Sequence, residues 1–118
     1  MLSDTNVQIV YLATPTGLHY RQGIKIIDSN KHFWSEKPIV QNSDQAYSLI
    51  KMANSNKLTI AEGFMYLHHP AFDFLKHTLR TYQLGNLNNI TIDFGLPQLV
   101  RPGFRNYDNL GGGAIYDL

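Results

Sequence analysis

The sequence contains no cysteine among its 118 residues, which excludes disulfides, thiolate zinc sites and cysteine nucleophiles. Charge is also scarce. A net charge of +1 leaves no electrostatic footprint for nucleic acid or an anionic membrane surface. No apolar run approaches the roughly 20 residues of a membrane-spanning helix, and residues 1–6 lack the basic-then-apolar order of a signal peptide. These absences predict a globular cytoplasmic protein with neither a nucleic-acid nor a membrane partner.

Several chemical motifs are absent as well. His68 and His69 are adjacent and would point apart on a regular element, and no His-Glu-x-x-His pattern exists. We therefore expect no metal ion. No nucleophile-elbow sequence, Walker loop or G-x-G-x-x-G fingerprint is present.

The first half of the chain alternates between strand and helix patterns. Residues 7–13 form a short apolar run rich in β-branched side chains, which is typical of a buried parallel strand. A helix is expected over 17–29 with Thr16 as its N-cap, followed by a strand over 32–35. Strand, helix and strand at this spacing predict a right-handed βαβ unit.

A second helix is expected over 43–55, capped by Ser43, and a third strand over 58–61. Beyond it the character changes. A helix is predicted from 70 to 84 with Gly85 as its left-handed stop, and residues 88–94 alternate like a half-exposed antiparallel strand.

These patterns predict an α/β fold. The C-terminal part of a Rossmann-like parallel sheet is followed by the beginning of an α+β domain with an open, mainly antiparallel sheet. We place the boundary so that residues 1–61 belong to the first domain and 62–118 to the second.

Three stretches could carry chemistry. Glu36, Lys37 and Pro38 follow a parallel strand, at the end of the sheet where α/β proteins bind ligands, although the spacing alone favours a solvated ion pair there. Residues 14–19 open a helix whose N–H groups suit an anion or a cofactor's polar edge, or form a plain capped turn. The run 111–113 is either close-approach backbone or a linker.

Together these segments resemble the Gfo/Idh/MocA family of NAD(P)-dependent oxidoreductases, with the matching pieces in family order along essentially the whole chain. The most specific pieces are Glu36-Lys37-Pro38 and Gly111-Gly112-Gly113-Ala114. The others are residues 10–19, 31–35, 62–70, 84–87, 104–105 and 115–118.

The resemblance implies NAD or NADP as cofactor and hydride transfer at a hydroxyl or carbonyl of a sugar, polyol or related small molecule. It also implies a role for each matching residue. Lys37 and Asp117 would be catalytic, and Tyr66 and His69 would border the substrate. The cofactor would be bound by Thr14, Pro15, Thr16, Gly17, Leu18, His19, Glu36, Lys37 and Arg105. The second domain of such enzymes often mediates homo-oligomerisation, which we expect of the full-length form.

Some expected parts of the family pattern are missing. The glycine-rich fingerprint would lie before Met1, and a His or Tyr partner of Asp117 would lie after Leu118. We therefore expect the chain to be part of a longer enzyme and to be inactive by itself. Two alternatives stay open: an NAD-dependent glycosidase of the same family, or a non-catalytic truncated binding or oligomerisation module.

Overall fold

The computed structural model describes residues 1–81, 85–95, 97 and 103–114. The chain forms two compact units. One contains residues 1–63 together with the described part of the C-terminal stretch, 103–114, and the other lies between residues 64 and 97. The domain boundary after residue 61 stays a prediction.

The first unit is built on a three-stranded parallel sheet. Its strands are β1 (Ile9–Leu12), β2 (His32–Ser35) and β3 (Ile60–Glu62), in the order β1-β2-β3. The central strand begins and ends where the sequence predicts. The predicted Rossmann-like parallel arrangement is therefore confirmed for this part of the chain.

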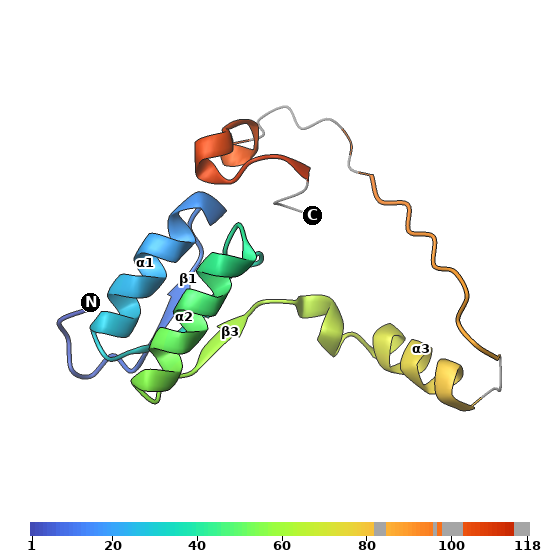
Figure 1. The fold of residues 1–118 in the computed structure, drawn as a ribbon, viewed down its shortest axis with the longest axis horizontal. Coiled ribbons are helices and arrows are strands. Elements are labelled where there is room, and N and C mark those ends of the chain that lie inside the picture. The colour runs from blue at the N-terminus through green and yellow to red at the C-terminus, as the bar shows by residue number, and fades with distance from the viewer. Residues whose placement is uncertain (82–84, 96, 98–102, 115–118) are drawn as a thin grey trace. The chain divides into compact units, whose positions relative to one another are not determined.

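Helices α1 (Thr16–Asp28) and α2 (Ser43–Ser55) connect the strands and pack side by side against one face of the sheet (Figure 1). Alternate strand residues, such as Val10, Leu12 and Phe33, point into this interface and are buried. The core is completed by Ile26, Ile27, Val40, Leu49 and Ala53. The opposite sheet face leaves large side chains such as Trp34 exposed.

Both predicted helix caps are wrong by one residue. The N-cap of α1 is Pro15, without a side-chain hydrogen bond, and Thr16 is buried in the first turn. The N-cap of α2 is Asn42, whose amide oxygen accepts a hydrogen bond from the backbone N–H of Gln45. Asparagine competes well with serine for this position, and only the backbone path decides between them.

The second unit contains a short 3-10 helix, η1 (Met65–His68), and the helix α3 (Pro70–Thr81). No residue of α3 is buried. Residues 82–84 lie outside the described part, so the predicted end of this helix at 84 is not tested. No strand is assigned to residues 85–95, because no described segment forms a hydrogen-bonded ladder with them. The antiparallel sheet stays a prediction.

None of the helices in the described residues is both long and apolar enough to cross a membrane.

Candidate active site

The turn at residues 36–38 follows the central strand, at the carboxyl edge of the sheet. Its peptide bond between Lys37 and Pro38 is cis. The backbone N–H of Glu36 donates to the carbonyl of Leu12 at 2.8 Å, so the pairing of β1 with β2 continues to the first residue of the turn. Ligands of open parallel sheets bind outside this edge. Glu36 and Lys37 therefore stand where the sequence predicts a site.

His19 links the two loops that leave β1 and β2. It is 1% exposed, with Nε2 2.6 Å from the carbonyl oxygen of Thr14 and Nδ1 2.9 Å from that of Pro38. The hydroxyl oxygen of Ser35 lies 3.3 Å from Nδ1. Both ring nitrogens thus face the protein's own atoms. The predicted contact of His19 with a cofactor stays a prediction, whereas its contact with the turn is direct.

Two further groups hold the backbone on either side of Lys37. The hydroxyl of Ser35 donates to the carbonyl of Glu36 at 2.9 Å, and the carboxylate of Glu62 accepts the backbone N–H of Ile39 at 2.7 Å. With His19, side chains from α1, β2 and β3 fix the backbone around Lys37. Such support from rigid elements is what a preorganised catalytic group requires.

Gly111 packs against the beginning of α1, and Gly112 packs against the backbone of Phe104 and Arg105. A Cβ built on Gly17 would meet the carbonyl oxygen of Asn109 at 2.6 Å, and one built on Gly111 would meet the nitrogen of Gly17 at 2.8 Å. Gly111 also has φ of 80°. Gly111 and Gly112 are buried, so this part of the run is close-approach backbone and not a linker. The backbone of residues 109–111 therefore lies directly against the first turn of α1.

The same packing brings Arg105 to the carboxyl edge. Arg105 lies in the 3-10 helix η2 (Gly103–Asn106), and its carbonyl accepts the backbone N–H of Gly113 at 3.1 Å. The following 3-10 helix, η3 (Asp108–Leu110), contacts α1. The first unit therefore contains residues 14–19, the turn with Glu36 and Lys37, and Arg105. Their contacts with a cofactor stay predictions.

The remaining predicted site residues cannot be placed beside these. Tyr66 and His69 belong to the second unit, where Tyr66 is 54% exposed and its ring lies 5.8 Å from that of Phe72. The Nδ1 atom of His69 accepts the backbone N–H of Ala71 at 3.1 Å, at the start of α3. Asp117 lies outside the described residues.

Sequence reasoning missed two residues at this edge. The hydroxyl of Tyr11 donates a hydrogen bond to the carboxylate of Glu36, and Glu62 supports Ile39 as described above. Glu62 ends β3 at the same sheet edge as Glu36, which is the signal that could have found it. Tyr11 precedes the end of its strand, so its link to Glu36 depends on a pairing register that the local sequence does not specify.

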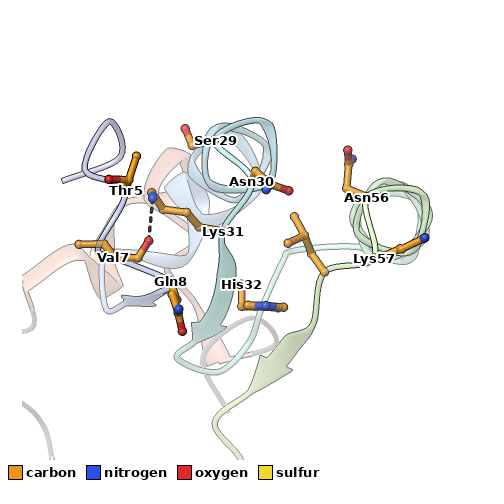
Figure 2. A pocket seen from close by; sticks show the side chains of 10 residues that line it. Thr5, Val7, Gln8, Ser29, Asn30, Lys31, His32, Asn56 and Lys57 are labelled. Carbon is orange, nitrogen blue, oxygen red and sulfur yellow. Dashed lines mark hydrogen bonds between the residues drawn. The ribbon is translucent and has the colours of Figure 1, made fainter.

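A polar cavity of about 680 Å³ lies at the opposite, amino end of the strands (Figure 2). Lys31 is 5% exposed there, and its ammonium donates to the carbonyls of Asp4 and Val7, each at 2.7 Å. These bonds fasten the first residues of the chain to the start of β2. The cavity is remote from the predicted site residues, and no described group of three His, Asp or Glu could hold a metal ion.

A parallel sheet with helical crossovers and polar loops gathered at its carboxyl edge is the architecture of dinucleotide-binding proteins. The model of the oxidoreductase family with an NAD-binding Rossmann fold, Gfo/Idh/MocA, matches residues 1–64, more than half of the chain. The chain belongs to this family. NAD or NADP is thus the cofactor of the family, as predicted.

Similar proteins extend the likeness over the whole chain. A dTDP-3,4-didehydro-2,6-dideoxy-alpha-D-glucose 3-reductase from Saccharopolyspora spinosa is 30% identical over 118 residues, which are all of this chain and 36% of the relative. A D-xylose 1-dehydrogenase (NADP(+)) from Haloferax volcanii is 27% identical over 120 aligned positions. The chain spans about a third of the length of these relatives.

A solved structure shows the same arrangement. The 3-ketoreductase KijD10 from Actinomadura kijaniata, crystallised with NADP and TDP-benzene, superposes on 99% of this chain with a TM-score of 0.92. Its sequence identity is 29%, and the match covers 36% of that protein.

Proposed function

We propose that this chain forms part of an NAD(P)-dependent oxidoreductase that reduces a carbonyl, or oxidises the corresponding hydroxyl, of a sugar. The observation that carries the proposal is the turn at Glu36 and Lys37. It stands at the ligand-binding edge of the sheet and is held by His19, Ser35 and Glu62. The relatives reported above are a sugar reductase and a sugar dehydrogenase, which supports the substrate class.

The described residues fit the nicotinamide end of the cofactor. The carboxylate of Glu36 is a hydrogen-bond acceptor suited to the two hydroxyls of a ribose. Residues 109–111 cover the start of α1, and the chain contains no glycine-rich phosphate fingerprint, so the pyrophosphate has no cradle among these residues. Thr14 and Arg105 offer further polar groups on the same unit.

Lys37 is the proposed proton donor. The cofactor, when bound, supplies the hydride. The Lys37 side chain donates a hydrogen bond to the reacting oxygen of the substrate and gives it a proton as a carbonyl becomes a hydroxyl. In the oxidative direction it takes that proton back. Glu36 orients the ribose, and the contacts around the turn hold Lys37 in place. Asp117, Tyr66 and His69 complete the proposed substrate site.

The specific substrate we propose is a keto sugar linked to a nucleoside diphosphate. Four relatives, including one from Saccharopolyspora spinosa and one from Actinomadura kijaniata, are named as reductases of a dTDP-linked keto sugar. Homo-oligomerisation and a cytoplasmic location stay predictions for the complete protein, by which we mean this chain with any residues that precede or follow it in its gene.

The test is a substrate panel assayed with the complete protein. It contains a dTDP-linked keto sugar with NADPH or NADH, free xylose with NADP or NAD, and a chromogenic glycoside with and without added NAD. We expect stoichiometric consumption of NAD(P)H with the keto sugar, and loss of turnover in Lys37→Ala. Glycoside cleavage without net redox would favour the glycosidase. The absence of both activities and of cofactor binding would favour a non-catalytic module.

A further inference from the structure

We propose that Tyr11 is a positioning residue for the cofactor. Its hydroxyl fixes the carboxylate of Glu36 so that the other oxygen accepts the hydroxyls of a vicinal diol, as in a ribose. This inference rests on the proposed function of Glu36. It begins from the hydrogen bond that Tyr11 donates to Oε1 of Glu36, which joins β1 to the turn after β2.

The sheet register places the two side chains on one face. Tyr11 pairs with Trp34 across the parallel strands, and Glu36 follows Trp34 by two residues. Because side chains of paired residues share a face, Tyr11 and Trp34 both lie on the face that α1 and α2 leave uncovered. The hydrogen bond from Tyr11 places the Glu36 carboxylate, in the turn after β2, beside them. Tyr11 is 54% exposed, so burial does not force its hydroxyl to find a hydrogen-bond partner within the protein.

The ring of Trp34 packs against the ring of Tyr11. The two ring centroids are 5.4 Å apart with an angle of 62° between the planes, an edge-to-face contact. Trp34 is itself close to the backbone after β3, since a Cβ built on Gly63 would lie 3.3 Å from its Nε1. The Tyr11 ring thus contacts the Trp34 ring, and its hydroxyl points toward Glu36 at the carboxyl edge of the sheet.

The hydrogen bond also defines what the carboxylate can still bind. The pKa of the Tyr11 hydroxyl is raised above 10 by this bond, with smaller contributions from burial and from the Glu36 charge. At neutral pH the phenol is therefore a donor. With one oxygen held by Tyr11, Glu36 keeps acceptor positions on its other oxygen. A negatively charged acceptor selects hydroxyl donors and repels phosphate, so the diol is the part of the cofactor that fits.

The test uses Tyr11→Phe in the complete protein, because this change removes only the hydroxyl. Binding of NADPH and of NADH is measured by nicotinamide fluorescence, and folding by thermal unfolding. We expect the cofactor Kd to rise about two- to tenfold, the range that a net hydrogen-bond contribution corresponds to, with the unfolding temperature nearly unchanged. Spectrophotometric titration of the apoprotein should lose one of the seven phenol groups, the one whose pKa is raised by Glu36.

Tyr20→Phe is the matched control. The hydroxyl of Tyr20 donates to Ser48 between α1 and α2 at 3.1 Å, so this variant loses a tyrosine hydrogen bond away from Glu36. Its cofactor Kd should equal that of the wild type. An equal loss of affinity in both variants would mean that Tyr11 acts through general stability, which contradicts the proposal.

A double-mutant cycle separates the role of Tyr11 from the role of Glu36 in cofactor binding. On a Glu36→Ala background, Tyr11→Phe should cause no further loss of cofactor affinity, because Tyr11 acts through Glu36. If Glu36→Ala weakens binding and Tyr11→Phe has either no effect or a fully additive one, the inference about Tyr11 is wrong and the proposed function stands. If Glu36→Ala leaves binding unchanged, the proposed role of Glu36 fails and this inference fails with it.

Discussion

Replacing Gly17 by alanine tests the packing of residues 109–111 on α1. The added Cβ would meet backbone atoms of Asn109 and Leu110 at 2.6–2.8 Å, whereas an ordinary contact begins near 3.4 Å. The segment must therefore retreat by roughly 0.8 Å or detach, and such overpacking costs about 1–3 kcal/mol. Alanine regains about 0.5–1 kcal/mol of helix stability. We expect a net destabilisation of about 1 kcal/mol, at the centre of the roughly 0–2.5 kcal/mol that the two ranges leave.

The assay is hydrogen exchange of the complete protein together with urea unfolding. Exchange should rise in residues 103–114 of Gly17→Ala, while the amides of β1 and β2 stay protected. Gly95→Ala is the control, because a Cβ built there has nothing within 4 Å. It should change stability by less than about 0.5 kcal/mol. If Gly17→Ala behaves like this control, the close contact between the two backbones does not exist.

Three further predictions follow from the same structure. Lys37→Ala should lower kcat sharply with little change in cofactor Kd. An equal fall in kcat and in cofactor affinity would show that Lys37 has a binding role only. Leu49→Ala should lower the free energy of unfolding by about 2–5 kcal/mol, because Leu49 is 1% exposed, whereas Ile50→Ala, at a 45% exposed position, should cost far less. The Asp73 carboxyl accepts a hydrogen bond from Lys76, which with the lysine charge lowers its pKa below 3.8. Its contribution to α3 is therefore present above pH 3.8 and lost as pH falls through the lowered pKa. Circular dichroism should show that helicity is lost as the pH falls through this lowered pKa. The Asp73→Asn variant should not show this loss.

The arrangement of the first unit was predictable because its signals are local. The apolar run before residue 13 and the pattern over 32–35 each match a strand within a few residues. The helix between them is the single crossover that connects two parallel strands. The helix caps were less predictable. Thr16 and Asn42 both carry capping groups, yet the cap depends on where the backbone leaves its extended path.

The support of the site was not predictable from local patterns. Glu36 and Lys37 stand out through their place after a strand. Tyr11 reaches Glu36 from another element, and His19 and Glu62 reach the backbone just after Lys37. Their contacts arise only from strand register and helix packing, which bring together residues 19–25 positions apart. A buried histidine in a helix start looks the same in sequence whether it faces a ligand or, as here, two backbone carbonyls.

The most direct test of the account is a crystal structure of the complete protein with NADP bound. The account predicts the nicotinamide ribose on the carboxylate of Glu36, with Tyr11 still donating to that carboxylate. It also predicts that the side-chain nitrogen of Lys37 faces the reacting carbon of the nicotinamide. A cofactor whose nicotinamide end lies away from this turn, with Glu36 and Lys37 touching neither ribose nor substrate, would contradict it.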